Sequence, residues 1–348
     1  MADTRRKRTG TGPKGRASDR VVAVTGAFGH LGRRLLMRLE LDPEIDRIVA
    51  IDVKNALALA EDETQPAALL RDHPRLSAHE LDLTTPGADR ELSEILRRER
   101  VGSLIHLAFL STPTHALELA HELETIGTLY ALHAAAEARL HGLISLSSTM
   151  CYGARADNPA WITEDQPLRP PSSRTLRDKT EADDQARRFQ AEHPEVAVAV
   201  ARLGAWVPGA PDHFWTRLLS RRLVPAVLGY DPLLQFLHAD DAATALHALW
   251  KSKARGAYNV VGRGVLPFSH VLTRLSRIPL YLPAGLGDGL IGALWSAQLV
   301  DMPKHFLEYL RWSWVCDDTR LREATGFVPH HDVDAVLMRF RAALANRG

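Results

Sequence analysis

Residues 21–32 read VVAVTGAFGHLG, an apolar run that leads into three glycines, Gly26, Gly29 and Gly32, spaced three residues apart. The run predicts a buried strand, and the apolar spacing of residues 29–40 predicts the helix that follows it. Glycines in such a turn let the backbone approach a ligand closely, and the helix N-terminus presents free N–H groups to a pyrophosphate. The stretch therefore predicts a dinucleotide-binding turn, with a purely structural glycine turn as the alternative.

The same alternation of apolar runs and helical patterns continues along the chain. We expect helices at 29–40, 89–100, 114–140 and 177–193, and strands at 21–26, 47–53, 75–83, 103–109, 142–148 and 196–204. Strands that alternate with helices predict an α/β protein with a Rossmann-type, doubly wound parallel sheet. We assign residues 20–204 to this dinucleotide-binding domain. Residues 205–348 are richer in Pro and Gly and predict a smaller substrate lobe, with a segment at about 235–262 returning to the first domain.

The charge is unevenly distributed. The formal net charge is +1, but residues 1–20 hold seven Lys and Arg against Asp3 and Asp19, so the remainder is mildly acidic. Because residues 1–19 contain few apolar side chains, we interpret them as a disordered basic tail. Nucleic-acid binding through this tail is the less favoured alternative.

Two further features bear on location and partners. The two cysteines, Cys151 and Cys316, form neither a disulfide framework nor a metal-binding pair, so we expect no metal site and a cytoplasmic protein. The apolar segment 285–300 contains Asp288 and Gln298 and is shorter than the ~20 residues of a membrane span. We expect it to be a buried or pocket-covering helix, and contact with a membrane surface is the alternative.

Asp52 ends the second expected strand, about twenty residues after Gly32. A carboxylate there accepts hydrogen bonds from the adenosine ribose and repels a 2′-phosphate, which favours NAD over NADP. Lys54 is close enough in sequence to weaken that preference.

At this point the chain resembles the extended short-chain dehydrogenase/reductase family, in its NAD-dependent epimerase/dehydratase branch. The matching segments occur in family order over about residues 20–330: TGAFGHLG (25–32), LDL (81–83), LIHLAF (104–109), IGT (126–128), LSSTMCYG (146–153), ARLGAWVPG (201–209), QFLHADDAATAL (235–246) and GAYNVVG (256–262). The resemblance implies that the cofactor is bound by Gly26, Phe28, Gly29, His30, Leu31, Gly32, Asp52, Asp82, Leu83, Leu107, Ala108 and Lys179. It also implies that Ser148 binds the reacting oxygen and that His238 is mostly structural.

The family's catalytic signature is YxxxK, and this chain keeps only half of it. Lys179 is one of 7 lysines against 36 arginines, but the position four residues earlier is Thr175. The resemblance implies that Lys179 binds the nicotinamide ribose, whereas an aliphatic hydroxyl is no comparable proton donor near neutral pH. Loss of a general acid or base costs roughly 10²- to 10⁴-fold in rate. The open alternatives are a water held by Thr175 and proton transfer by Tyr152, with Thr149 and His106 less favoured.

The substrate signals are weaker. Sugar-nucleotide members of the family commonly carry an Asn after the sixth strand, where this chain has Ala205 and Trp206. Core packing is the favoured explanation for most of the apolar residues in this part of the chain, and a more apolar substrate pocket is the alternative. These residues are Trp206, Phe214, Trp215, Phe268, Leu286, Leu290, Trp295 and Trp312.

We therefore expect an NAD-dependent oxidoreductase or epimerase that acts on an alcohol or ketone of a small molecule, including one with an apolar portion, by an altered proton path. The alternative is a catalytically impaired NAD(H)-binding sensor that works through a partner. The resemblance also implies a homodimer, formed by the helical segments at about 114–140 and 177–193.

Overall fold

The computed structural model describes residues 18–53, 73–110, 114–206, 214–297 and 303–345. Its larger lobe is built on a seven-stranded sheet in the order β11-β6-β5-β4-β1-β2-β3. Every neighbouring pair in this sheet is parallel. The strands are β1 (Ser18–Thr25), β2 (Arg47–Asp52), β3 (Leu76–Glu80), β4 (Val101–His106), β5 (Gly142–Ser148), β6 (Ala197–Leu203) and β11 (Gly256–Val260).

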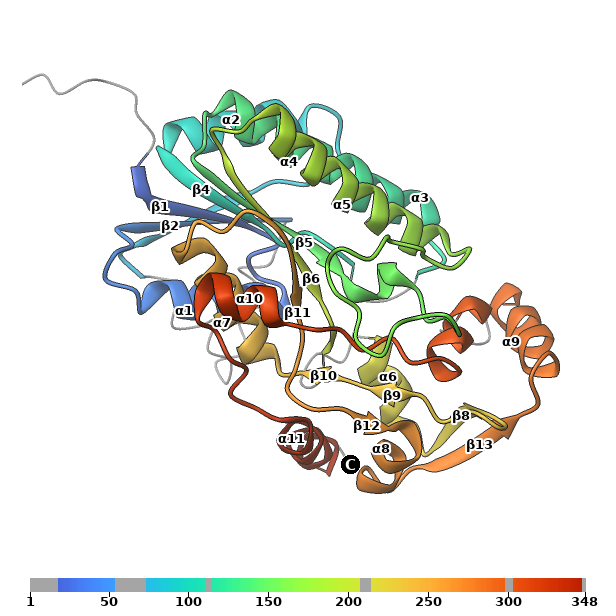
Figure 1. Cartoon of the computed structure of the whole chain (residues 1–348). Coiled ribbons are helices and arrows are strands. Elements are labelled where there is room, and N and C mark those ends of the chain that lie inside the picture. The colour runs from blue at the N-terminus through green and yellow to red at the C-terminus, as the bar shows by residue number, and fades with distance from the viewer. Residues whose placement is uncertain (1–17, 54–72, 111–113, 207–213, 298–302, 346–348) are drawn as a thin grey trace, which may run out of the picture.

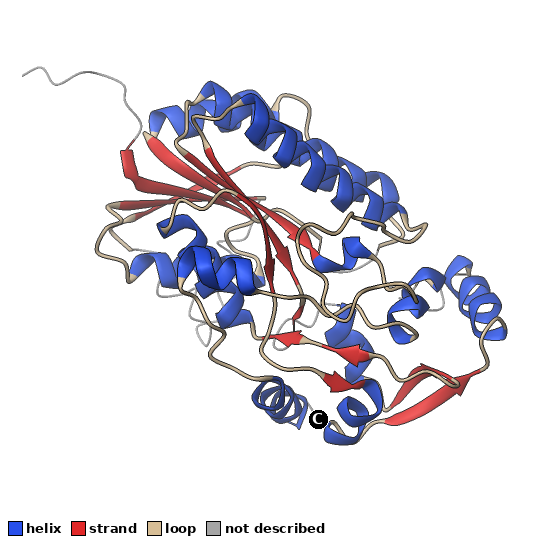
Figure 2. Ribbon diagram, viewed as in Figure 1, coloured by secondary structure: helices blue, strands red, loops and turns tan. Residues whose placement is uncertain are grey.

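Helices cover both faces of the sheet (Figures 1 and 2). One face carries α2 (Ala88–Arg98), α3 (Leu117–His121), α4 (Gly127–Glu137) and α5 (Arg174–Glu192), and the other carries α1 (His30–Glu40), α7 (Ala239–Lys251) and α10 (Thr319–Thr325). The apolar stripe of α1 explains its place, because Leu31, Leu35 and Leu39 are spaced one turn apart and are all buried. The predicted doubly wound sheet is confirmed.

The second lobe has its own apolar core around Trp215, Phe236 and Phe340. Its elements are α6 (Phe214–Ser220), α8 (Phe268–Arg274), α9 (Leu286–Ser296), α11 (Val333–Ala345), the 3-10 helix η5 (Lys304–Leu310), and the short strands β7 (Ala205–Trp206), β8 (Leu223–Val227), β9 (Leu233–Leu234), β10 (Phe236–Leu237), β12 (Leu266–Pro267) and β13 (Ile278–Leu282). The core also takes in Tyr152 and Ile162, so residues that precede position 205 contribute to this lobe.

Two expected helices differ in detail. The helix expected at 114–140 is divided, because a π-helical turn, η3 (Glu122–Ile126), separates α3 from α4. The helix expected at 177–193 begins earlier, at Arg174, so that Thr175 lies inside its first turn. The π-turn was not expected, because five residues are too few for a change in hydrophobic spacing to be recognised.

The remaining expectations concern the ends of the chain and the apolar segment. The expected tail at 1–19 lies almost entirely outside the described residues, as does Lys54. In α9, Ile291 is buried and Trp295 stacks on His115 at 3.7 Å between ring centroids, while Ala293 and Ser296 are exposed. This helix therefore lies at the surface with one covered side. None of the helices in the described ranges is both long and apolar enough to cross a bilayer.

Candidate active site

Three glycines shape the turn between β1 and α1. Gly26 has a φ of +64°, a left-handed conformation that favours glycine, and a Cβ on it would lie 2.7 Å from the carbonyl oxygen of Leu107. A Cβ on Gly32 would lie 2.3 Å from the carbonyl oxygen of Gly26, so α1 passes directly over the turn. The N-terminus of α1 has Gly29 as its cap and no acidic residue in its first turn. Its N–H groups and positive dipole end can therefore bind a pyrophosphate.

Asp52 lies beside this turn, at the end of β2. Its Oδ2 accepts a hydrogen bond from the N–H of Phe28 at 2.8 Å, and its Oδ1 accepts one from the N–H of Val53 at 2.8 Å. Burial raises the pKa of Asp52, against the opposing effect of these N–H groups and of the Arg33 guanidinium. These hydrogen bonds fix the carboxyl group beside the glycine turn. Arg33, which the sequence analysis did not select, is a cation near this carboxylate.

The other predicted cofactor residues lie at the same edge of the sheet. Asp82 and Leu83 follow β3, whose Glu80 pairs with Asp52. Asp82 is exposed and accepts hydrogen bonds from the N–H and hydroxyl of Thr84 at 2.9 and 2.7 Å, whereas Leu83 is buried. The structure therefore brings the glycine turn and the ends of β2 and β3 together.

The strand at the centre of the sheet adds the next wall. The N–H of Leu107, just after β4, donates to the carbonyl oxygen of Thr25 at 3.1 Å, and Ala108 follows it against the Gly26 turn. Trp206 stacks on His30 with ring centroids 5.5 Å apart. Because His30 is the first residue of α1, Trp206 from the second lobe packs at the mouth of the predicted pyrophosphate site.

Lys179 lies on α5 with its side chain largely buried. Its Nζ donates hydrogen bonds to Glu124 Oε1 at 2.6 Å and to the carbonyl oxygen of Leu110 at 2.9 Å. The ammonium group also lies 4.8 Å from the centroid of the Phe109 ring, within cation–π range. These contacts hold the lysine beyond the end of β4.

Glu124 is the functional candidate that the sequence analysis missed. It is fully buried in the π-turn, and its Oε1 also accepts a hydrogen bond from the N–H of Leu110 at 2.9 Å. Burial raises the pKa of Glu124, although the positive charge of Lys179 opposes that effect. The sequence carried no signal that singles out Glu124, because Glu118 and Glu122 lie in the same helical stretch.

Thr175 and Ser148 are the other predicted catalytic residues. Thr175 is buried one helical turn before Lys179 on α5. Ser148 ends β5, where its hydroxyl accepts a hydrogen bond from the N–H of Met150 at 3.2 Å and donates a long one to the carbonyl oxygen of Leu203 at 3.5 Å. Both residues therefore belong to elements that end or begin at the carboxyl edge of the sheet.

Tyr152 is buried, and its hydroxyl already has two partners. The hydroxyl donates to Asn259 Oδ1 at 2.9 Å and accepts from Arg202 Nη1 at 2.7 Å. Burial raises the pKa of Tyr152 above its ordinary value. Because the buried Tyr152 hydroxyl donates its one proton to Asn259, proton transfer to a substrate would require this hydrogen bond to break.

Several of the apolar residues considered for a pocket are core residues, and another borders a cavity. Phe214, Trp215 and Phe268 are buried in the core of the second lobe, which is the packing role that the sequence analysis favoured. Trp312 is partly buried and borders a cavity of about 350 Å³, which Arg155, Arg169 and Glu308 also line. The side chains of Leu286 and Leu290 lie outside the described set.

His238 has the structural role that was expected. Its Nδ1 accepts a hydrogen bond from the N–H of Asp240 at 3.2 Å and so caps α7, and its ring stacks on His331 at 4.0 Å. Within the described ranges, no three His, Cys, Asp or Glu side chains are grouped closely enough to hold a metal ion.

These features define a class of protein. A glycine turn under a helix N-terminus, an acidic strand end and a lysine, all at the carboxyl edge of a doubly wound parallel sheet, are typical of enzymes that use a nicotinamide dinucleotide. The chain belongs to the NAD dependent epimerase/dehydratase family, whose model matches residues 22–261. The family assignment confirms the predicted resemblance and NAD as the cofactor, and it agrees with the expectation that the protein is an enzyme.

Two curated relatives and two solved structures illustrate the likeness. Uncharacterized proteins of Mycobacterium bovis (strain ATCC BAA-935 / AF2122/97) and Mycobacterium tuberculosis (strain ATCC 25618 / H37Rv) are 30% identical over 321 residues, which cover 89% of this chain and 80% of theirs. The UDP-glucose 4-epimerase of Thermus thermophilus in complex with NAD has a TM-score of 0.69 and 15% identity, covering 94% of this chain and 100% of its own. MoeE5 in complex with UDP-glucuronic acid and NAD has a TM-score of 0.69 and 21% identity, covering 94% and 99%.

Proposed function

We propose that this protein catalyses NAD-dependent hydride transfer at an alcohol or ketone group of a small molecule, by a proton path that differs from that of a YxxxK enzyme. The observation that carries the proposal is the common location of the Gly26 turn, Asp52 and Lys179 at one edge of the sheet. NAD, when bound, accepts or returns the hydride. The protein supplies binding, orientation and the handling of the proton.

The number of donors on Lys179 supports its assigned role. An ammonium group has three N–H donors, and Glu124 and Leu110 take two of them. One donor is left for a ribose hydroxyl, without breaking either contact. Ser148 at the end of β5 is the proposed partner of the reacting oxygen, and Thr175 is adjacent to the same region through α5.

The cavity next to Gly153 supports a proposal for the rest of the substrate. It lies beside the short helix η4 (Thr149–Tyr152), and it combines the cationic Arg155 and Arg169 with the Trp312 ring. Each of these arginines pairs with Asp157, at 3.2 and 2.8 Å, so the cavity wall is not strongly cationic. We propose a substrate with both a polar and an apolar part, bound with the polar part nearer the arginines.

The proposed function is tested first by binding and then by turnover. Calorimetry with NAD and NADP should show tighter binding of NAD. Lys179→Ala should weaken NAD binding by about 10- to 100-fold, since a hydrogen bond to a charged group contributes roughly 1.5 to 3 kcal/mol. Lys251→Ala is the matched control, because Lys251 pairs with Asp42 on a helix end remote from the glycine turn. Equal binding by both variants would refute the assigned site.

Turnover should be measured as a change in nicotinamide absorbance with a panel of sugar nucleotides, steroids and acyl ketones. The proposal predicts that at least one alcohol or ketone reduces or oxidises the cofactor, and that Lys179→Ala loses this activity. Binding of NAD without turnover of any compound would instead support the second candidate.

The second candidate is an NAD(H)-binding sensor. It is favoured because Thr175 stands where a YxxxK enzyme has its tyrosine, and because the hydroxyl of Tyr152 already contacts Asn259 and Arg202. A Thr175→Tyr variant separates the two functions. Activity that appears only in this variant would indicate that the natural chain lacks a complete proton path.

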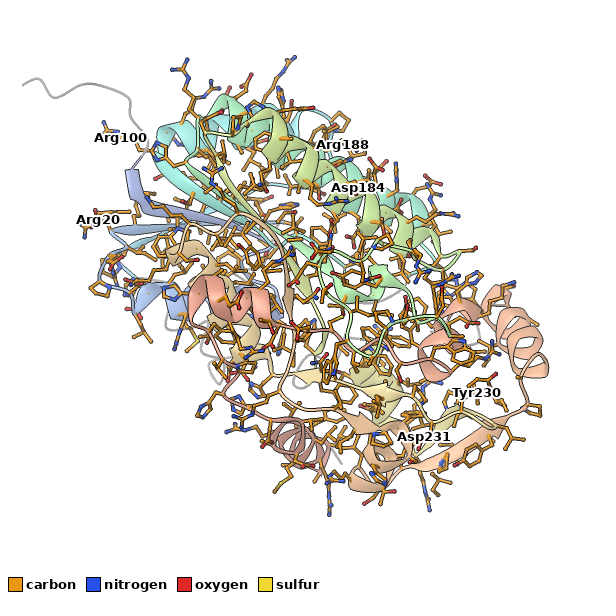
Figure 3. All side chains as sticks on the ribbon, in the orientation of Figure 1. Arg20, Arg100, Asp184, Arg188, Tyr230 and Asp231 are labelled. Atoms are coloured by element: carbon orange, nitrogen blue, oxygen red, sulfur yellow. The ribbon has the colours of Figure 1, made fainter. Side chains whose placement is uncertain are left out.

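We also propose that the protein is a homodimer that pairs through the α4 and α5 side of the sheet. Leu119 and Leu129 are about half exposed on this side, and Figure 3 shows the charged side chains of Asp184 and Arg188 on its outer surface. Leu129→Glu should shift the protein toward the monomer in light scattering. Met338→Glu, at an exposed apolar residue on α11, should leave the mass unchanged, whereas an unchanged mass for Leu129→Glu would count against this interface.

A further inference from the structure

We infer that Glu124, acting through Lys179, holds the proton that the missing tyrosine would otherwise handle. This inference rests on the proposed function and deepens it. Glu124 is a positioning residue, because it would act on a substrate only through Lys179. The two residues would form a relay in place of the Tyr and Lys pair of the family.

The first support is geometric. The distance of 2.6 Å between Lys179 Nζ and Glu124 Oε1 is that of a short, charge-assisted hydrogen bond. Glu124 is fully buried, and its second oxygen, Oε2, has no hydrogen-bond partner among the described residues. A purely structural ion pair in the interior would be stabilised by satisfying all of its oxygens. The unpartnered oxygen leaves room on the carboxyl group for a proton.

The surroundings of the carboxyl group favour proton uptake. On α5, the charged groups facing Glu124 are Lys179 and Asp178, and Asp178 is paired with His121 of α3 at 3.0 Å. From the β4 side the contacts are the neutral N–H of Leu110 and, around the lysine, the Phe109 ring. Desolvation, together with the negative charge of Asp178, raises the pKa of Glu124. A buried carboxylate with such neighbours is a better proton acceptor than an exposed one.

The π-turn explains why the carboxyl group reaches this place. It inserts an additional residue between α3 and α4, and the hydroxyl of Thr128 donates to the carbonyl oxygen of Glu124 at 2.6 Å. π-turns of this kind are frequent at functional sites. The turn directs Glu124 inward, beneath Lys179, rather than toward solvent.

With NAD bound, oxidation of an alcohol would move a hydride, with its two electrons, from the carbon to the cofactor. Because an ammonium group has no lone pair, Lys179 would first pass the proton that it shares with Glu124 Oε1 to that carboxylate. The resulting amine would take a proton from the ribose hydroxyl that it binds, and that hydroxyl would take the proton of the substrate hydroxyl. The lysine remains an ammonium, Glu124 becomes a carboxylic acid, and the substrate becomes a ketone. Reduction of a ketone runs through the same transfers in reverse.

The test that needs no substrate is an infrared pH titration of the wild-type protein with NAD bound, compared with Glu124→Gln under the same conditions. The inference predicts a protonated-carboxyl band that appears at higher pH than for an ordinary glutamate and is missing in Glu124→Gln. Identical spectra for the two proteins would overturn the inference. Thermal unfolding of Glu124→Gln, which keeps the size of the side chain, should confirm that the variant is folded; if it is not, Glu124→Asp takes its place in the comparison, with a shifted band expected and an unchanged band contradicting the inference.

The second test uses the substrate that the absorbance screen identifies. Alcohol oxidation by the wild type should fall toward low pH, as Glu124 becomes protonated. Glu124→Gln should lower kcat by roughly 10²- to 10⁴-fold and lose that acidic limb. NAD affinity should change much less, Glu124→Asp should keep the limb, and Thr175→Tyr added to Glu124→Gln should restore part of kcat.

The outcomes separate this inference from the proposed function. If the wild-type protein does not bind NAD, the proposed cofactor site is refuted. Normal NAD binding and turnover, with an acidic limb that persists in Glu124→Gln, would refute only the role of Glu124. A parallel loss of NAD affinity and kcat in both Glu124 variants would show a structural role for Glu124 and would equally overturn the inference.

Discussion

At the scale of the residue, His106 shows how burial alone can decide a chemical role. Its ring is fully buried between β1 and α4, where Nδ1 lies 2.7 Å from the Thr25 hydroxyl and Nε2 lies 3.3 Å from the Thr128 hydroxyl. Burial lowers the pKa of His106 to about 4. The ring is therefore neutral near pH 7 and links β1 to α4. This burial argues against His106 as a proton donor, which was one of the less favoured alternatives for the proton path.

This residue gives a pH-dependent prediction. Because the folded-state pKa of about 4 lies below the ordinary value of 6.5, the contribution of the neutral ring to stability is fully present above pH 6.5 and is lost as the pH falls toward 4. From pH 7 to pH 5 the free energy of unfolding should fall by about 2 kcal/mol on this account. Denaturant unfolding at the two pH values, for the wild type and His106→Gln, isolates this contribution. An equal pH dependence in both proteins would contradict it.

At the scale of the element, the β1–α1 turn depends on the absence of a side chain at Gly32. A Cβ there would meet two carbonyl oxygens, those of Gly26 at 2.3 Å and Ala27 at 2.4 Å, and neither can move without shifting the backbone of the turn. The turn could accept a Cβ at position 32 only if its backbone moved. The glycine is therefore required by the fold of the turn as well as by the cofactor.

We expect Gly32→Ala to lower the free energy of unfolding by roughly 1 to 3 kcal/mol, which is typical of overpacking, and to weaken NAD binding. Gly289→Ala is the control, since Gly289 lies within α9 and a Cβ added to it would have no neighbour within 4 Å among the described residues. An alanine in that exposed helix should be neutral or stabilising by up to about 1 kcal/mol. Unfolding curves measured for both variants would contradict the prediction if the two changes had the same sign and size.

At the scale of the whole molecule, the two lobes share a buried polar network. Arg202 on β6 donates to both carboxylate oxygens of Asp183 at 2.8 Å and to the Tyr152 hydroxyl at 2.7 Å. Asn259 on β11 extends this network to the carbonyl oxygens of Ile162 and Asp317 at 3.0 and 3.1 Å. The network thereby fastens chain segments of the second lobe to α5 and the end of the sheet.

Arg202→Met should lower the free energy of unfolding by roughly 3 to 5 kcal/mol, because it leaves the Asp183 carboxylate buried with too few partners. Arg187→Met is a close control: Arg187 contacts the same carboxylate at 3.0 Å, but its side chain is 46% exposed. An exposed pair contributes about 1 kcal/mol or less. Chemical denaturation of the two variants should show this difference, and similar losses for both would mean that burial is not the cause.

Much of the fold and of the cofactor site could be predicted from local signals. Apolar runs and helical spacing reflect burial of the same segment in which they occur, so the six predicted strands of the sheet were found with small errors at their ends. Gly26 and Asp52 are recognisable because a turn and a strand end require particular residues at short range. The division of the expected helix at 114–140 was missed, because the five residues of η3 are too few for a change in hydrophobic spacing to be recognised.

The sequence by itself determined the class of this protein: the Rossmann-type sheet, the dinucleotide turn, the preference for NAD, and the retention of Lys179 without its tyrosine. Only the tertiary structure decided what the reactive side chains contact. Glu124 and Lys179 are 55 residues apart, and Tyr152 and Asn259 are 107 residues apart, so no local pattern connects them. The physical reason is that burial and pairing of polar groups depend on which elements pack together, and that packing places a carboxyl group beneath Lys179 and pairs the Tyr152 hydroxyl with Asn259 and Arg202.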